Sequence, residues 1–326
     1  MQIFITEHSK SGNSQTINAT NMPAISVNNI VKTYDKGNIL ALDKVSFEVQ
    51  QGELFGLIGA DGAGKTTLFR LLTTLLLPDS GTAQVLGFDT AKDLWAIRKI
   101  VGYMPGKFAL YQDLSITENL EFFATVFNTT IAQNYHLIED IYVQIAPFKD
   151  RLAGKLSGGM KQKLALCCAL IHEPKVLLLD EPTTGVDPVS RKEFWDMLDR
   201  LRARGITIVV STPYMDEALR CDRIALIQKG HILDIDTLEG ILAKYPKRLY
   251  AVRSENMFRL LNDLRQYSQT DTCFAFGEYL HLSLKNGEAD ASATEAYLQS
   301  RQHTQLSFKP VAPTIEDAFI ELMQAQ

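Results

Sequence analysis

The residues best suited to chemistry begin with a glycine-rich segment that ends in lysine and threonine. It comprises Gly59, Ala60, Asp61, Gly62, Ala63, Gly64, Lys65, Thr66 and Thr67. The segment follows an apolar run and opens a helical pattern, the context in which a G-x-x-x-x-G-K-[ST] loop closes its backbone N–H groups around phosphate oxygens. Lys65 is then placed to neutralise β- and γ-phosphates, and Thr66 to bind Mg²⁺. The alternative, a turn without a ligand, requires a pattern that arises by chance in about one such chain in a hundred.

A second candidate is a pair of carboxylates at the end of the apolar segment 176–179. Asp180 is placed to hold Mg²⁺ through water, and Glu181 to polarise an attacking water as a general base. Taken alone, the same residues fit a strand with a solvated acidic end equally well. Together with the phosphate loop, they favour a site that hydrolyses a nucleoside triphosphate.

A third candidate is the helix start at Ser157, Gly158 and Gly159. Bare glycines at a helix N-terminus offer backbone N–H groups to an anion. Because the phosphate loop already covers one side of a nucleotide, this second cradle suits a phosphate held from the opposite side. The alternative is a flexible turn capped by Ser157.

Strand and helix patterns alternate around these motifs. Ser115 and Glu118 have capping-box spacing, and residues 107–163 as a whole have a helical pattern. Asp187 and Pro188 supply an N-cap and a first-turn proline to another helix. This alternation predicts an α/β fold with a parallel sheet that is covered on both faces. The segments that predict strands are 25–31, 45–49, 54–58, 176–179, 206–211 and 223–227.

The pattern changes near Pro246. Three short apolar segments (249–252, 280–284 and 306–309) alternate there with helical segments at about 256–267, 293–301 and 314–323. We therefore expect three parts: a polar leader over residues 1–24, a main domain over 25–246, and a small α+β accessory domain over 247–326.

Length and composition exclude several classes. The 326 residues exceed the number that one core usually serves, about 250–300. With 33 basic and 38 acidic residues the net charge is −5, and no basic block is present to grip nucleic acid. No apolar run reaches the ~18–20 residues of a membrane helix. Cys167, Cys168, Cys221 and Cys273 lack metal-ligand spacing, so we expect a reducing, cytoplasmic location.

In this order, the three motifs resemble the ATP-binding cassette (ABC) family from about residue 25 to 244. The resemblance implies an ABC-type P-loop fold with a mixed sheet and a helical subdomain at about 107–163, and ATP and Mg²⁺ as ligands. Two cassettes would face each other, so that Ser157, Gly158 and Gly159 reach the partner's nucleotide. Tyr34 would stack on adenine; the alternative is a strand-end tyrosine with a wet hydroxyl. The loop at 185–187 would communicate across the dimer.

The chain is similar to one branch of this family, the ATPase subunits of ABC-2 type exporters. The similarity is carried by the phosphate loop, by the tract 154–163, and by the ending Pro313-Thr314-Ile315-Glu316-Asp317-Ala318-Phe319. It is greatest to the first, often degenerate, cassette of tandem versions. It implies a bacterial exporter of drugs, lipids or glycans, with this subunit on the inner face of the membrane beside integral membrane permease subunits. Phe108, Leu110, Tyr111 and Leu114 would receive a permease helix; ordinary packing is the alternative.

Two positions depart from the family pattern. Gly106 stands where the family keeps a glutamine of the Mg²⁺ and water shell, and Pro213 stands where it keeps a histidine that contacts the γ-phosphate. Proline has neither an imidazole nor a backbone N–H. A second hypothesis remains open for this reason: a regulatory cassette that completes a partner's site with little hydrolysis of its own. A third hypothesis, independent of these two positions, is a soluble cassette of DNA repair or ribosome rescue. The acidic charge and single cassette disfavour the last.

Overall fold

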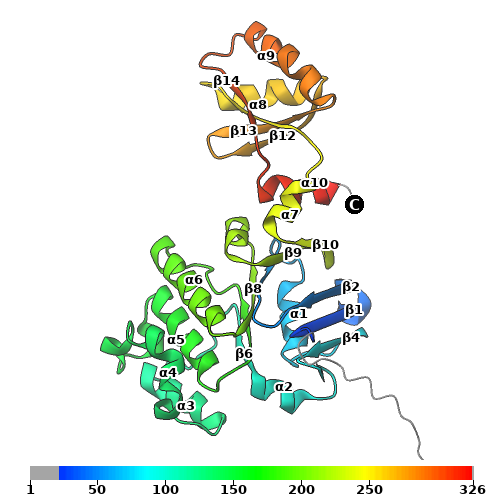
Figure 1. Ribbon diagram of the computed structural model, residues 1–326. Helices are drawn as coiled ribbons and strands as arrows, with labels where there is room; N and C mark the ends of the chain where they lie inside the picture. Colours follow the sequence, from blue (N-terminus) through cyan, green and yellow to red (C-terminus); the bar gives the residue numbers. More distant parts are fainter. Residues whose placement is uncertain (1–21, 325–326) are drawn as a thin grey trace, which may run out of the picture.

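The computed structural model describes residues 22–324 (Figure 1). The leader predicted over residues 1–24 therefore lies almost wholly outside the described part. None of the helices within residues 22–324 combines the length and the apolar character needed to cross a bilayer.

A six-stranded sheet forms the centre of the larger part, in the order β10-β9-β3-β8-β7-β6. Its strands are β3 (Leu54–Ile58), β6 (Val101–Met104), β7 (Val176–Asp180), β8 (Thr207–Thr212), β9 (Arg223–Gln228) and β10 (His231–Asp236). All are parallel except β10, which pairs antiparallel with β9. Every residue of β3 and β7 is buried, as expected for continuous apolar strands covered on both faces.

A four-stranded antiparallel sheet lies beside it, in the order β2-β1-β4-β5. Its strands are β1 (Ile25–Tyr34), β2 (Ile39–Val49), β4 (Ser80–Val85) and β5 (Phe88–Asp89), with the short turn η2 (Asp35–Gly37) between the first two. Helix α1 (Lys65–Leu72) shares a buried apolar cluster with both sheets, and helix α2 (Leu94–Ile100) precedes β6. Apolar packing against strands of both sheets therefore fixes the position of α1.

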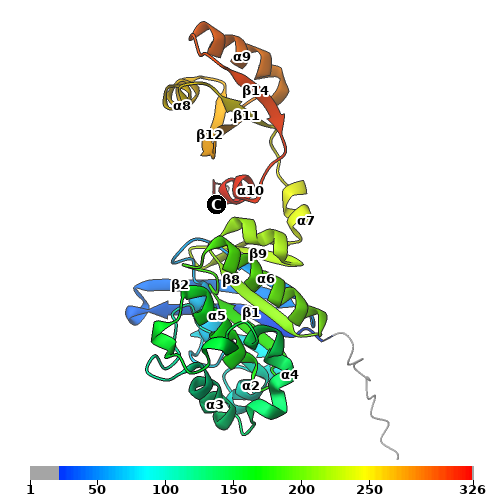
Figure 2. The ribbon, with the colours of Figure 1, turned by 90° about the vertical axis from the view of Figure 1, so that its left-hand side faces the viewer.

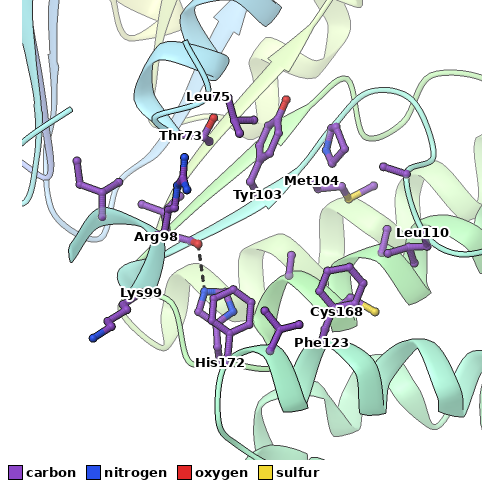
Figure 3. Close-up of a pocket in the computed structure, with 18 of the residues that line it drawn as sticks. Thr73, Leu75, Arg98, Lys99, Tyr103, Met104, Leu110, Phe123, Cys168 and His172 are labelled. Carbon is purple, nitrogen blue, oxygen red and sulfur yellow. Dashed lines mark hydrogen bonds between the residues drawn. The ribbon is translucent and has the colours of Figure 1, made fainter. Parts of the chain in front are cut away.

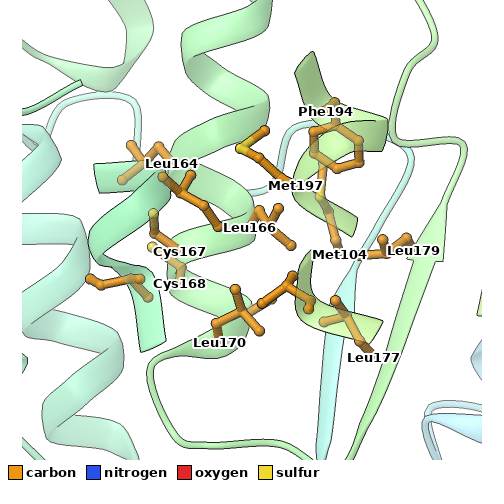
Figure 4. Close-up of a cluster of buried hydrophobic side chains, with 14 of the residues drawn as sticks. Met104, Leu164, Leu166, Cys167, Cys168, Leu170, Leu177, Leu179, Phe194 and Met197 are labelled. Carbon is orange, nitrogen blue, oxygen red and sulfur yellow. The ribbon is translucent and has the colours of Figure 1, made fainter. Parts of the chain in front are cut away.

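Helices cover the other face of the central sheet. They are α3 (Ile116–Val126), α4 (Ile131–Tyr142), α5 (Gly158–Leu170) and α6 (Pro188–Ala203), with short turns η3 (Ala146–Phe148) and η4 (Ala153–Lys155). Figure 4 shows Cys167 and Leu166 of α5, Met197 of α6 and Leu177 of β7 in one buried cluster. All four cysteines are free thiols, and burial raises the pKa of Cys167 well above its usual range.

The helical pattern predicted from residue 107 begins later in the structure. Residues 107–114 form turns, and the first helix starts at Ile116. The predicted capping box is present: the Ser115 hydroxyl accepts from the Glu118 N–H, and the Glu118 carboxylate accepts from the Ser115 N–H. The side chain of Asn119 holds the preceding turn by bonding both the N–H and the carbonyl of Tyr111, at 3.0 Å each. These bonds stabilise a loop where the sequence pattern predicted a helix.

The C-terminal part is a second antiparallel sheet, in the order β12-β13-β11-β14. It consists of β11 (Leu249–Arg253), β12 (Thr270–Phe276), β13 (Tyr279–Leu284) and β14 (Ser307–Val311), with helices α8 (Met257–Gln266) and α9 (Ala291–Ser300) and the turn η6 (Gly287–Asp290). Figures 1 and 2 show this sheet standing apart from the larger part, with α7 (Leu238–Ala243) and α10 (Ile315–Gln324) between them.

Helix α10 packs on the larger part although it follows the C-terminal sheet in the chain. Phe319 and Ala318 share a buried cluster with Ile58 of β3 and Ile224 of β9. Asp317 of the same helix pairs with His281 of β13, with 2.9 Å between carboxylate oxygen and Nδ1. The last helix thus connects the two parts.

Candidate functional site

The carboxyl ends of four parallel strands meet at one edge of the central sheet, and a motif follows each of them. The phosphate loop follows β3, Gly106 follows β6, Glu181 follows β7, and Pro213 follows β8. The register pairs Asp180 with Ser211. Ligands of open α/β sheets bind at such an edge.

The phosphate loop has the shape that its glycines permit. Gly62 and Gly64 have φ of +77° and +109°, a region that L side chains rarely adopt. A Cβ on Gly64 would lie 2.6 Å from the Ala41 carbonyl oxygen, and one on Gly59 would lie 2.1 Å from that of Ile227. Ala60, Asp61 and Gly62 are exposed, so this backbone is open to a ligand. The residues present therefore fit a bound phosphate chain.

Lys65 lies at the centre of the site as the first residue of α1. Its side chain is only 3% exposed, and its ammonium donates to the carbonyl oxygens of Gly59 at 2.8 Å and Ala60 at 3.0 Å. The same nitrogen lies 3.1 Å from a carboxylate oxygen of Glu181. The structure thus brings together the lysine, at the start of α1, and the predicted general base, directly after β7.

Ser211 joins the two predicted carboxylates, and the sequence patterns did not single it out. Its hydroxyl donates to Asp180 Oδ1 at 2.5 Å and accepts from the Glu181 N–H at 3.0 Å. Asp180 is 2% exposed, so this bond satisfies a buried charge. The sequence carried no local signal for this contact, because only the strand order of the folded sheet places Ser211 of β8 beside Asp180 of β7.

Thr66 and Thr67 lie in the first turn of α1, and Tyr34 lies beside it. Thr66 directly follows Lys65 and is half-buried. The Tyr34 hydroxyl, at the end of β1, lies 3.3 Å from Thr67 Oγ1, so this ring borders the phosphate loop. Within residues 22–324 no group of three or more His, Cys, Asp or Glu side chains could hold a metal. A site whose protein ligands would be only Thr66 and Asp180 fits Mg²⁺, because this ion keeps several waters and binds substrate phosphates.

The two departures, Gly106 and Pro213, both lie at this edge. A Cβ on Gly106 would lie 3.1 Å from the Asp180 carbonyl oxygen and 3.8 Å from its carboxyl carbon, so a side chain here would extend beside Asp180. Pro213 is followed by Tyr214, whose ring carries the Arg191 guanidinium 4.4 Å above it. With glycine at position 106, no side chain extends from this position beside Asp180.

Ser157, Gly158 and Gly159 lie at the N-terminus of α5, where the Ser157 hydroxyl caps the Met160 N–H. A Cβ on Gly158 would lie 3.5 Å from the Gly185 carbonyl oxygen, and one on Gly159 would lie 2.6 Å from Ser190 Oγ. These glycines therefore border the 185–187 loop and α6, whereas the neighbours of the phosphate loop are Ala41, Ile227 and Glu181. Ser157 and Gly158 are exposed.

An apolar groove of about 550 Å³ opens between β6, α2 and the helices α3 and α5 (Figure 3). Phe108 and Leu110 of the predicted docking surface line it, beside Pro105. Tyr103 lies on the wall of this groove, and its pKa is raised to about 12, mainly by burial and to a smaller extent by the charge of Asp180. His172 bonds the Val101 carbonyl through Nε2 at 3.0 Å, and burial lowers its pKa.

Known proteins resemble this chain over most of its length. The family model described as ABC transporter matches residues 42–184. The probable multidrug ABC transporter ATP-binding protein YbhF of Escherichia coli is 38% identical over 93% of this chain; the chain covers 52% of that relative, about half its length. The Nod factor export ATP-binding protein I of Mesorhizobium japonicum is 31% identical, over 96% of this chain and 90% of that protein.

Solved structures agree with the fold described above. The cbiO1 protein of Clostridium perfringens, part of an ABC transporter complex, has a TM-score of 0.61 at 25% identity, over 68% of this chain and 91% of that one. The dimeric ATP-binding cassette MJ0796, bound to ADP and Pi, has a TM-score of 0.60 at 25% identity, over 66% and 98%. The predicted fold class is confirmed. This chain belongs to the family of ABC transporter ATP-binding proteins.

Proposed function

We propose that this chain is the ATP-binding and ATP-hydrolysing subunit of a bacterial ABC-2 type exporter. The observation that carries the proposal is the meeting of Lys65, Asp180 and Glu181 at one sheet edge, with Lys65 and Glu181 3.1 Å apart. Relatives named for multidrug transport, Nod factor export and doxorubicin resistance support an exported cargo of the drug, lipid or glycan class.

Each site residue has a role that its surroundings permit. The loop from Gly59 to Thr67 would wrap the phosphates of ATP, with the Lys65 ammonium on the β- and γ-phosphates and Tyr34 beside the adenine. Thr66 and Asp180 would hold Mg²⁺, which when bound neutralises phosphate charge. Glu181 would take the proton of the attacking water as the bond from its oxygen to the γ-phosphorus forms and the bridging P–O bond breaks.

Coupling to transport requires two partner proteins, a second cassette and a permease subunit. The exposed Ser157 and Gly158, with Gly159 behind them, would bind the nucleotide of a second cassette, either a copy of this chain or a different one. The groove lined by Phe108 and Leu110 would seat a helix of a permease subunit. The chain would then lie on the inner face of the membrane, with the cassette over residues 25–246 and the accessory domain over 247–326.

Steady-state ATP hydrolysis by the purified chain, with Lys65→Ala as background, tests the proposal. We expect turnover above that background which Glu181→Gln lowers by at least about tenfold, the range in which a general base acts. Turnover at background in folded protein that binds ATP would contradict hydrolysis at its own site.

We also propose a second candidate, favoured by Gly106 and Pro213. In it, this chain pairs with a different cassette, holds ATP with little turnover, and supplies Ser157, Gly158 and Gly159 to the partner's site. The missing side chain beside Asp180 and the missing imidazole support it, because each removes a group from the γ-phosphate end of the site. If the isolated chain shows only background turnover and turnover rises when the partner cassette is added, that result would favour this candidate over the first.

A further inference from the structure

One buried carboxylate, Glu217, accepts three hydrogen bonds close to the site without belonging to any motif. It lies in η5 (Met215–Arg220) and is 2% exposed. Its Oε1 accepts from Thr183 Oγ1 at 2.7 Å, from Arg191 Nε at 2.6 Å and from Trp195 Nε1 at 2.9 Å. Burial of a carboxylate is costly unless it is paired, so the three bonds to Oε1, one of them from a guanidinium, hold their members together. The second oxygen, Oε2, is buried without a hydrogen-bond partner in the structure.

The three donors come from two segments, the turn after β7 and helix α6. Thr183 lies two residues after Glu181 and is 1% exposed. Arg191 and Trp195 belong to α6, whose N-cap Asp187 ends the 185–187 loop. Arg191 also binds the Asp216 carboxylate at 2.8 Å and lies over the Tyr214 ring. The segment after β7, the segment after β8 and the start of α6 are therefore joined at one atom.

The backbone at Glu181 needs such support. Its φ is +49°, a left-handed conformation that non-glycine residues rarely adopt. Such conformations persist where the surroundings over-determine them. Ser211 holds the near side of the turn through the Glu181 N–H, and the Thr184 N–H bonds the Glu181 carbonyl at 3.2 Å. The Thr183 hydroxyl is the side-chain contact that holds the far side.

We propose that Glu217 is a positioning residue for Glu181. Fixed by Arg191 and Trp195, its carboxylate anchors Thr183 and so maintains the left-handed turn that directs Glu181 toward Lys65. The same anchor fixes the segment that carries Pro213. This inference rests on the proposed ATPase function only for its catalytic consequence, because the anchoring of the turn is a property of the folded chain itself.

The test is Thr183→Val in the full chain, which removes the hydroxyl and keeps the shape. Two readouts are measured: amide hydrogen exchange in peptides that cover residues 181–186, and kcat and KM for ATP. We expect faster exchange in these peptides, kcat lowered about tenfold, and KM within twofold because the phosphate loop is untouched. Thr183→Ser, which keeps the hydroxyl, should restore both readouts.

Thr294→Val is the matched control, since Thr294 is also buried and donates its hydroxyl, to the Asp290 carbonyl at 2.7 Å, but lies in α9. It should leave both readouts unchanged. Glu217→Gln combined with Thr183→Val should lower kcat no further than the more severe single variant, because residues acting through one bond are not additive. Unchanged exchange in Thr183→Val, or additive losses in the double variant, would overturn the inference.

Failure of the inference differs from failure of the proposed function. Wild-type turnover equal to that of Lys65→Ala contradicts hydrolysis at this site, whereas hydrogen exchange still decides whether Glu217 anchors the turn. Turnover above background with normal kcat in Thr183→Val contradicts the positioning role alone.

Discussion

At the scale of single residues, the site depends on positions where a side chain is absent as much as on those where one is present. Lys65 has its three nearest polar partners in Gly59, Ala60 and Glu181, which fixes the ammonium in a buried place. The glycines around it allow the backbone to come this close. Side chains and missing side chains therefore make separate, testable contributions.

Gly64 and Gly62 should differ in their tolerance of alanine. A Cβ on Gly64 would lie 2.6 Å from a backbone oxygen, whereas one on Gly62 would meet nothing within 4 Å, although both have positive φ. We expect Gly64→Ala to weaken ATP binding at least about a hundredfold. Gly62→Ala should weaken ATP binding only about tenfold, because its only cost is a backbone strain of about 1–2 kcal/mol. Titration with a fluorescent ATP analogue measures both, and equal losses would contradict the distinction.

Pro213→His should raise kcat about tenfold or more, because it returns an imidazole and a backbone N–H to the γ-phosphate end of the site. Gly106→Gln should raise it less, since its Cβ would meet the Asp180 carbonyl oxygen at 3.1 Å and requires a small shift. Steady-state turnover with Lys65→Ala subtracted measures both variants. No gain from either would mean that these positions do not limit hydrolysis.

At the scale of secondary structure elements, the contact between the helices and the central sheet includes the titratable side chain of His172. His172 follows α5, stacks on Phe127 at 3.9 Å between ring centroids, and bonds the Val101 carbonyl of β6. Its Nδ1 is buried without a partner in the structure. Burial lowers the pKa of His172, so the neutral ring is the form that fits.

Stability should therefore depend on pH through His172. The unfolded chain protonates this histidine near pH ~6.5 and the folded chain only at lower pH. The contribution of the neutral His172 ring to the free energy of unfolding is fully present above pH ~6.5. It is lost as the pH falls from that value toward the lower pKa of the folded chain. Urea unfolding at pH 7.5 and 5.5 should show a loss on acidification that is smaller in His172→Gln. An equal loss in both proteins would assign it to other groups.

Elements with strong local signals were predictable from the sequence. The Ser115–Glu118 capping box and the Asp187–Pro188 helix start appear as expected, because a cap involves residues within one turn. Strand β4 was not predicted, since only two of its six residues are buried and it has little apolar alternation. The turn at 107–114 was predicted as helix, because the Asn119 bonds that close it join residues eight positions apart.

At the scale of the whole molecule, α10 makes the accessory part and the cassette interdependent. Phe319 is 6% exposed and packs in one cluster with Ile58 and Ile224. We expect Phe319→Ala to lower the free energy of unfolding of the cassette by about 3–5 kcal/mol. Phe258→Ala is the control: that ring is 77% exposed, and its loss should cost within about 0.5 kcal/mol. Denaturant unfolding measures both, and equal effects would show that α10 does not support the cassette.

The exposed helix start at Ser157 should matter more to transport than the chain's own Glu181 if the second candidate holds. Ser157→Ala or Gly158→Asp would then damage the partner's competent site, whereas Glu181→Gln would affect a site with little turnover. Gly158 suits this test because a Cβ there has 3.5 Å of clearance, unlike at Gly159. A transport assay compares the variants, and equal or reversed effects would favour a symmetric pair.

The local form of the individual motifs could be predicted from the amino-acid sequence, because a glycine-rich turn or a helix cap depends on neighbours within a few positions. Contacts between residues that are distant in the chain could not be predicted in this way. The pairing of Lys65 with Glu181, the bond from Ser211 to Asp180, and the three donors on Glu217 join segments 22 to 116 positions apart. Only packing of strands and helices in three dimensions decides such contacts, because no local pattern specifies which strand ends meet at one edge.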